Sequence, residues 1–155
     1  MTNLEIQATL QSCEFLKNIP PEHLTTISEL GSIDHYTAGE YIFRQGDFGE
    51  DLFIIVEGYV FLERAMDIGK HKGSVVIDAL GKGRTLGCWS TLLDEPHVLM
   101  SSANCQKDST VVRLKGRKLR NCMEEDTSFG FFMLERLCFL LRERIQAAYG
   151  AMDKI

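Results

Sequence analysis

The stretch that decides the fold lies between residues 39 and 60 and reads Gly39-Glu-Tyr-Ile-Phe-Arg-Gln-Gly46-Asp-Phe-Gly-Glu-Asp51-Leu-Phe-Ile-Ile-Val-Glu-Gly58-Tyr-Val60. Short runs of β-branched and aromatic residues alternate here with glycines, which is typical of strands joined by tight turns. The run from Leu52 to Val56 is apolar at every position, so we expect a strand that is covered on both faces. Gly58 predicts a tight reversal, which would make residues 51–62 a β-hairpin.

The same strand pattern extends in both directions, from residue 32 to residue 114. A second hairpin is predicted to join residues 59–66 to residues 74–80 through the polar loop 67–73. Many short strands divided by glycines and polar turns are typical of a sandwich or barrel. We therefore expect an all-β body over residues 32–114.

Helical patterns flank this body. Before it, apolar residues recur at helical spacing in residues 1–31, where Pro20-Pro21 can begin a short helix and Gly31 can end it. After it, residues 115–155 carry a longer helical repeat. The predicted fold class is α+β, with an eight-stranded β-roll of the jelly-roll type between N-terminal helices and a long C-terminal helix. All of it forms a single domain, 1–155.

The C-terminal repeat has a further property, because its apolar positions alternate steps of three and four as in a coiled-coil seam. We expect this seam to form a homodimer with the same helix of a second copy, although a helix packed only on its own domain is the open alternative. The predicted dimer-interface residues are Phe131, Leu134, Cys138, Leu141, Ile145, Ala148 and Met152.

Composition argues against a required cofactor. The 155 residues are 45% hydrophobic and 25% charged, and a core of this size can be stable without a metal or a disulfide. The five cysteines include no C-x-x-C pair and the four histidines are isolated, so neither a metal site nor a cupin-type metalloenzyme is predicted. We expect a protein that is not an enzyme.

The charge balance argues against nucleic acid as a partner. The formal net charge is -5 and the pI is about 5.4, whereas non-specific binding to phosphate backbones needs an excess of cations. The basic run 113–120 is interpreted as a solvated edge, with a contact to a partner or to nucleic acid as the alternative. The chain carries neither a secretion signal at its start nor an apolar run of ~20 residues, so we expect a cytoplasmic protein that does not bind membranes.

Three segments together resemble the cyclic nucleotide-binding domain family, the sensor domain of the catabolite activator and fumarate-nitrate regulator class. They are Phe-Leu-Lys-Asn-Ile-Pro at 15–20, the glycine-punctuated run at 36–47, and the apolar strand with its glycine at 52–60. The resemblance covers nearly the whole chain and implies a stand-alone sensor. Transcription factors of this family carry a helix-turn-helix domain after the long helix, and the sequence has none, so we expect an unknown downstream protein partner rather than DNA.

In this family a phosphate-binding cassette holds the ligand: helix N-terminal amides and an arginine bind the cyclic phosphate, and a glutamate binds the ribose hydroxyl. The resemblance places the cassette at residues 83–103. Cys88 stands where the family has glutamate, and His97 followed by Val98 stands where it has arginine. A hydrogen bond to a charged group is worth roughly 1.5–3 kcal/mol, so this degenerate cassette is predicted to bind cyclic AMP weakly.

The donors that remain predict a site for a cyclic nucleotide or another small anion. Backbone amides at residues 88–90 can form an anion nest, His97 can add positive charge, and Tyr149 can stack on a base. Purely structural roles for Trp89, His97 and Tyr149 are the alternative. The predicted ligand-binding residues are Gly87, Cys88, Trp89, Ser90, Thr91, His97, Ser101, Ser102 and Tyr149.

Two functions follow from this sequence. The first is effector sensing, in which a small ligand at the cassette shifts the C-terminal helix of a dimer in bacterial signal transduction. The second is a ligand-free interaction or scaffold module that has kept the fold and lost the pocket chemistry. A haem-based sensor is a weaker third hypothesis, because no residue pattern supports a haem ligand.

Overall fold

The computed structural model describes residues 2–154 apart from residues 70, 88–91, 94 and 96. Two N-terminal helices, α1 (Asn3–Ser12) and α2 (Pro21–Leu30), precede the strands, and two helices, α3 (Gly116–Glu125) and α4 (Thr127–Met152), follow them. The strands are β1 (Gly31–Tyr36), β2 (Tyr41–Phe43), β3 (Phe48–Gly49), β4 (Asp51–Glu57), β5 (Val60–Ile68), β6 (His71–Leu80), β7 (Thr85–Gly87), β8 (His97–Val98), β9 (Ser102–Cys105) and β10 (Ser109–Lys115).

Local sequence explains where the helices begin. The Thr2 hydroxyl accepts a hydrogen bond from the Glu5 amide (3.2 Å), and the Glu5 carboxylate accepts one from the Thr2 amide (2.6 Å), which forms a capping box at α1. Pro21 occupies the first turn of α2, where its missing N–H costs nothing. The side chain of Asp126 caps α4 by accepting from the amide of Phe129.

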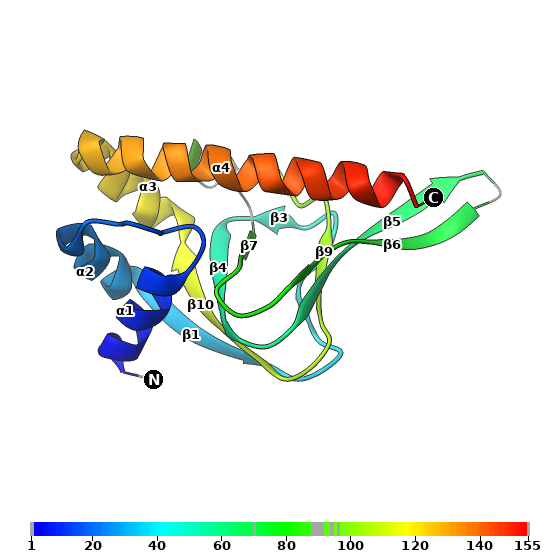
Figure 1. The fold of residues 1–155 in the computed structure, drawn as a ribbon, viewed down its shortest axis with the longest axis horizontal. Coiled ribbons are helices and arrows are strands. Elements are labelled where there is room, and N and C mark those ends of the chain that lie inside the picture. Colours follow the sequence, from blue (N-terminus) through cyan, green and yellow to red (C-terminus); the bar gives the residue numbers. More distant parts are fainter. Residues whose placement is uncertain (1, 70, 88–91, 94, 96, 155) are drawn as a thin grey trace.

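The strands form two four-stranded sheets. Together these make the β-roll that lies below α4 in Figure 1. The first sheet has the order β1-β10-β4-β7 and the second has the order β2-β9-β5-β6, while β3 and β8 form a separate two-stranded ladder. Every strand pairing within the described residues is antiparallel. The α+β fold with a β-roll and a long C-terminal helix is therefore confirmed.

The predicted hairpin at residues 51–62 is wrong. β4 belongs to the first sheet and β5 to the second, so the chain crosses from one sheet to the other at Gly58 instead of pairing with itself. Gly58 has a φ of 138°, and a Cβ there would lie 2.2 Å from the Ser109 hydroxyl oxygen. The glycine is thus required for a crossing beside β10 rather than for a two-residue turn.

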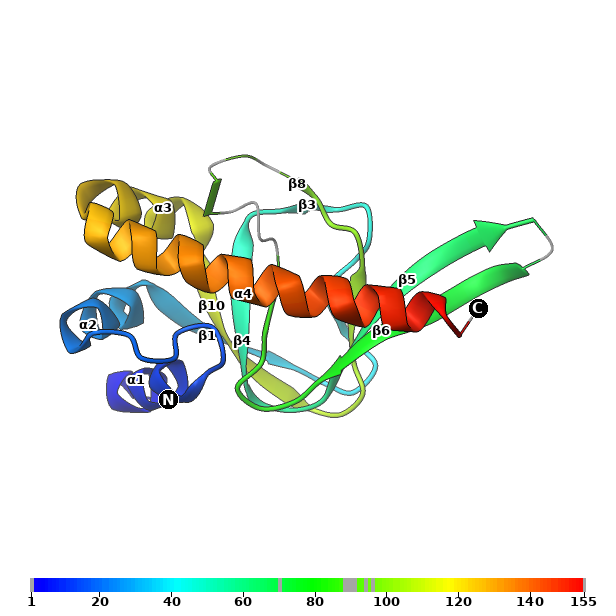
Figure 2. The same ribbon diagram turned by 45° about the horizontal axis from the view of Figure 1, so that its top comes forward.

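The second predicted hairpin is confirmed, and its strands are longer than expected. β5 pairs with β6 from Val60 opposite Leu80 out to Ile68 opposite His71. The strands therefore extend into the polar loop predicted at 67–73. This long β5–β6 hairpin projects from the roll past the C-terminal end of α4 (Figure 2).

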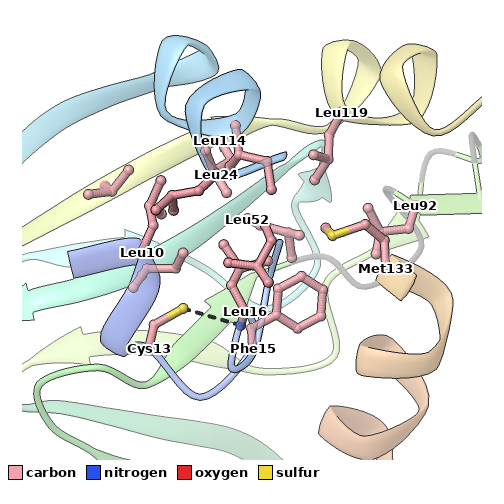
Figure 3. Close-up of a cluster of buried hydrophobic side chains, with 14 of the residues drawn as sticks. Leu10, Cys13, Phe15, Leu16, Leu24, Leu52, Leu92, Leu114, Leu119 and Met133 are labelled. Atoms are coloured by element: carbon pink, nitrogen blue, oxygen red, sulfur yellow. Dashed lines mark hydrogen bonds between the residues drawn. The ribbon is translucent and has the colours of Figure 1, made fainter. Parts of the chain in front are cut away.

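Two hydrophobic cores stabilise the domain. One lies between the helices and the first sheet and includes Leu10, Phe15, Leu52, Leu119 and Met133 (Figure 3). The other lies inside the roll, between the sheets. β4 serves both cores because Leu52 and Ile54 face the helices while Phe53 and Ile55 face the roll interior. This confirms that the strand is covered on both faces.

α4 links the two ends of the molecule. Its first half packs on the helical core through Phe129, Met133 and Leu137, and its second half lies over the β-roll and reaches the β5–β6 hairpin (Figures 1 and 2). A helix of 26 residues is much longer than the helical core needs. Its second half therefore covers the strands of the β-roll.

Candidate functional site

A cavity of about 780 Å³ lies between the second half of α4 and the β-roll. A volume of this size falls in the range of small-molecule sites. Its walls come from the strands, the segment before β9 and α4. The described residues that line it are Phe43, Leu52, Leu62, Arg64, Met66, Val75, Ile77, Leu86, Gly87, His97, Leu99, Met100, Ser101, Leu140, Leu141, Arg144, Ile145, Ala148, Ala151 and Met152.

Two regular elements shape the long walls. On the β5–β6 hairpin, side chains two residues apart share a face, and Leu62, Arg64 and Met66 all line the cavity. On α4, Leu141, Ile145 and Ala148 follow helical spacing on one face. The cavity is thus a slot between one face of a hairpin and one face of a helix.

The two ends of this slot differ in exposure. Leu52, Leu62, Leu86, Leu99 and Leu140 are all buried, and they are grouped as the inner end because Leu62 and Leu140 are the lining residues of β5 and α4 farthest from the hairpin tip and from the end of α4. Arg64, Met100, Ile145 and Met152 are exposed, and they form the mouth beside the hairpin. These two sets are called the inner end and the mouth below.

Arg64 brings a positive charge to the mouth. Its Nη1 donates a hydrogen bond to the Met100 carbonyl oxygen at 2.6 Å, which holds the side chain against the segment before β9. Among the residues that the structure describes, no carboxylate forms an ion pair with it. Arg64 therefore offers an uncompensated charge to a ligand.

Arg144 lines the same cavity, and its charge is compensated. Its Nη2 lies 2.9 Å from Oε1 of Glu14 and also donates to the Thr85 carbonyl, while its Nη1 lies 3.7 Å from Oδ2 of Asp78. Arg84 approaches the same two carboxylates, at 2.6 Å from Glu14 and 3.7 Å from Asp78. Two arginines and two carboxylates form a neutral cluster that fixes α4 to β6, β7 and the loop after α1.

The structure brings together three of the predicted ligand residues, since Gly87, His97 and Ser101 all line the cavity. Gly87 has a φ of 124°, and a Cβ there would lie 2.5 Å from the Asp51 carbonyl oxygen, so β7 can approach β4 only with glycine at this position. Cys88, Trp89, Ser90 and Thr91 lie outside the described residues.

Ser102 and Tyr149 do not line the cavity. The Ser102 hydroxyl accepts a hydrogen bond from the Gln45 amide at 2.8 Å, which joins the β2 and β9 regions. Tyr149 is 65% exposed on the outer side of α4. In this conformation Tyr149 does not cover the cavity.

The lining residues on α4 and on the hairpin were not predicted as ligand contacts. The alternation of Leu62, Arg64 and Met66 was visible in the sequence, and an arginine between two apolar residues on one face was the available signal. Arg144 had no such signal, because its partners lie 59 to 130 positions away in the sequence.

The predicted dimer seam divides between two environments. Phe131, Cys138, Ile145 and Met152, spaced by seven, are exposed, while Leu134, Leu141 and Ala148 are half-buried. In the second half of α4, the four seam residues Leu141, Ile145, Ala148 and Met152 also line the cavity. The face expected to meet a second copy therefore includes part of the cavity wall.

The basic run at 113–120 contains five cations, and Arg113 and Arg120 among them form ion pairs within the chain. Arg113 lies 2.6 Å from the Asp34 carboxylate, and Arg120 lies 2.9 Å from that of Glu124. Within the described part of the chain, no cluster of three or more His, Cys, Asp or Glu side chains is arranged to hold a metal ion. None of the described helices combines the length and hydropathy needed to cross a membrane.

The sequence of this chain is similar to known cyclic nucleotide-binding domains. The model of the cyclic nucleotide-binding domain matches residues 33–126, which is more than half of the chain. The mouse cGMP-dependent protein kinase 2 is 31% identical over 91 residues, and the human one is 31% identical over 86 residues. Those matches cover 59% and 56% of this chain, and the chain spans only 12% and 11% of the two kinases.

Solved structures share the fold over almost the whole chain. A cyclic nucleotide-binding domain from Methylobacillus flagellatus KT superposes with a TM-score of 0.80 at 19% identity, over 99% of this chain and 84% of that one. The regulatory subunit of a cAMP-independent protein kinase A from Trypanosoma brucei gives 0.71 at 21% identity, over 98% of this chain and 52% of that one. The chain belongs to the cyclic nucleotide-binding domain family.

Proposed function

We propose that this chain is a non-enzymatic, cytoplasmic sensor domain of bacterial signal transduction, in which a small ligand in the cavity changes the position or rigidity of α4. One observation carries the proposal: the second half of α4 lines the cavity, and the exposed apolar residues Ile145 and Met152 belong both to that wall and to the outward stripe of the helix. A ligand that prefers one helix position shifts the population of states by its difference in affinity for them. The exposed stripe makes that shift visible to a partner.

A homodimer through α4 is the proposed form in which the signal is read. The residues Phe131, Cys138, Ile145 and Met152 recur every seven positions along an exposed face. An apolar row of this spacing is suited to a two-fold helix pair. The partner that binds this dimer is then a downstream protein and not a nucleic acid.

Cyclic AMP at ordinary affinity is not the proposed ligand. The positions of the family's glutamate and arginine hold Cys88 and His97, so the charged partners of ribose and phosphate are absent from the sequence there. A neighbour of the same fold is described as the regulatory subunit of a cAMP-independent kinase. We expect the dissociation constant for cyclic AMP to be millimolar or higher.

A thermal-shift and calorimetric titration with cyclic AMP, cyclic GMP, cyclic dinucleotides and small carboxylates tests the sensor function. We expect one class to bind saturably, and Ala148→Trp to abolish that binding because the indole fills the cavity. Ala147→Trp is the matched control, since Ala147 is half-buried outside the cavity wall. If no class binds and the two variants behave alike, the ligand-free interaction module becomes the better function.

That second function has one observation in its favour. The cluster of Glu14, Asp78, Arg84 and Arg144 fixes α4 to β6, β7 and the loop after α1 through the chain's own side chains. A domain that only presents a rigid helix to a partner needs nothing more.

A further inference from the structure

We propose that the cavity takes an amphipathic carboxylate: an apolar chain or ring occupies the inner end, and the carboxylate binds Arg64 at the mouth. This inference rests on the proposed function, because both place the ligand in the same cavity. It adds the chemical class and the residue that anchors it.

The inner end selects for an apolar body. Its buried walls are leucines from β4, β5, β7, α4 and the segment before β9, and none of these five side chains can donate or accept a hydrogen bond. An apolar group buried there is stabilised in proportion to the area removed from water. A hydroxyl or amide buried there loses its hydrogen bonds to water and gains none from these side chains. The described walls at this end therefore favour hydrocarbon over sugar.

The mouth selects for a negative charge. Arg64 is the lining cation whose charge no described carboxylate neutralises, and its bond to the Met100 carbonyl uses only one of its five N–H donors. A guanidinium binds a carboxylate through two parallel hydrogen bonds, so it fixes direction as well as charge. His97 and Ser101 lie on the same cavity wall as further polar groups.

Arg144 does not compete for this role. Its Nη2 donates to Glu14 and to the Thr85 carbonyl, its buried Nη1 lies 3.7 Å from Oδ2 of Asp78 with no hydrogen-bond partner among the described residues, and the cluster to which it belongs is neutral. A ligand carboxylate beside Arg144 would also approach the carboxylates of Glu14 and Asp78. The charge pattern thus places the ligand's head at the mouth and its tail toward the leucines.

The order of polar groups along the slot therefore matches one type of molecule, with a single anionic end and an apolar remainder. A seven- to ten-carbon chain or a phenyl ring on a short chain has this form. 4-Phenylbutyrate and decanoate are suitable probes, 4-phenylbutanamide has the same body without the charge, and acetate has the charge without the body.

Calorimetry on the lipid-free protein tests the inference with these four probes and with cyclic AMP. We expect 4-phenylbutyrate and decanoate to bind, the amide to bind roughly tenfold more weakly, and acetate not to bind measurably. Arg64→Gln should weaken 4-phenylbutyrate about tenfold and leave the amide unchanged. Arg142→Gln, on an exposed arginine outside the cavity, is the control and should change neither.

A charge reversal makes the test sharper. Arg64→Glu should lose 4-phenylbutyrate and gain 4-phenylbutylamine, a result that misfolding cannot produce. The inference is wrong if neither carboxylate binds at millimolar concentration, or if Arg64→Gln binds them as the wild type does. If cyclic AMP binds while the carboxylates do not, the inference fails and the sensor function stands.

Discussion

Nη2 of Arg144 lies 2.9 Å from Oε1 of Glu14, which joins the middle of α4 to the loop after α1 across 130 positions of sequence. The same carboxylate oxygen accepts the Thr85 amide at 2.9 Å, and Arg84 Nε lies 2.6 Å from the other oxygen. Glu14 is thus the point at which the helix over the cavity, the first strand of the cassette segment and the N-terminal helices meet.

Arg144→Ala should therefore destabilise the domain by roughly 1–3 kcal/mol, since it leaves two half-buried carboxylates with one arginine. Urea denaturation measures this loss. Glu143→Ala, at an exposed position next to it on α4, should change stability by less than about 0.5 kcal/mol. A double-mutant cycle with Glu14→Gln should show that the two losses are not additive, and additive losses would mean that the contact is not formed in solution.

Gly87→Ala should be costly for a different reason. The new Cβ would meet the Asp51 carbonyl oxygen at 2.5 Å in a backbone conformation with positive φ, so β7 must move away from β4. We expect a loss of roughly 1–3 kcal/mol in the free energy of unfolding. Gly73→Ala, where a Cβ meets open space and φ is not positive, is the matched control. Equal stability of the two variants would contradict this strand geometry.

Cys13 should be unreactive in the folded protein. Burial raises the pKa of its thiol to about 11 from 9.0, which lowers the thiolate fraction at pH 8 about a hundredfold. Iodoacetamide at pH 8 should label exposed Cys138 within minutes and leave Cys13 unlabelled, as peptide mass spectrometry can show. Because the folded-state pKa is raised, the contribution of the protonated thiol to stability is present below pH 9 and is lost as the pH rises through 11. Rapid labelling of Cys13 would mean that the helical core opens readily.

The proposed dimer is best tested at the N-terminal end of the α4 seam, because the seam residues there do not line the cavity. Phe131→Asp places a charge on a side chain that is 70% exposed and distant from the ligand walls. Light scattering should show a wild-type dimer at micromolar concentration and a monomeric variant, because a charge in an apolar helix seam is not compensated. Gln146→Asp, at an exposed position off the seam, should remain dimeric. A monomeric wild type would contradict the proposed homodimer.

Sequence patterns correctly predicted that β4 is buried on both faces, but they did not predict that the chain crosses from the first sheet to the second at Gly58. The apolar run around Ile54 correctly predicted a strand covered on both faces, because that property depends only on local composition. The hairpin at Gly58 was wrong, since a glycine marks a change of direction and does not say which sheet the next strand joins. That choice depends on β10 and its Ser109, about 50 residues away.

The candidate site was predictable only where the resemblance supplied it. Gly87, His97 and Ser101 do line the cavity, but the resemblance gave no position for Arg64, which belongs to a hairpin far from the cassette in sequence. The role of Arg144 depends on contacts with Glu14 and Asp78, which only the folded chain brings together. Ion pairs between distant elements leave no periodic signal in a sequence.

Hydrogen exchange with and without saturating 4-phenylbutyrate tests the central claim most directly, because one measurement reports backbone protection in both α4 and β5, the two long walls of the cavity. We expect slower exchange in residues 140–152 of α4 and residues 60–68 of β5, with no change in residues 3–12 of α1. The same protection should be absent in Ala148→Trp. Unchanged exchange in both α4 and β5, in a protein that binds the probe, would contradict a ligand site beneath α4.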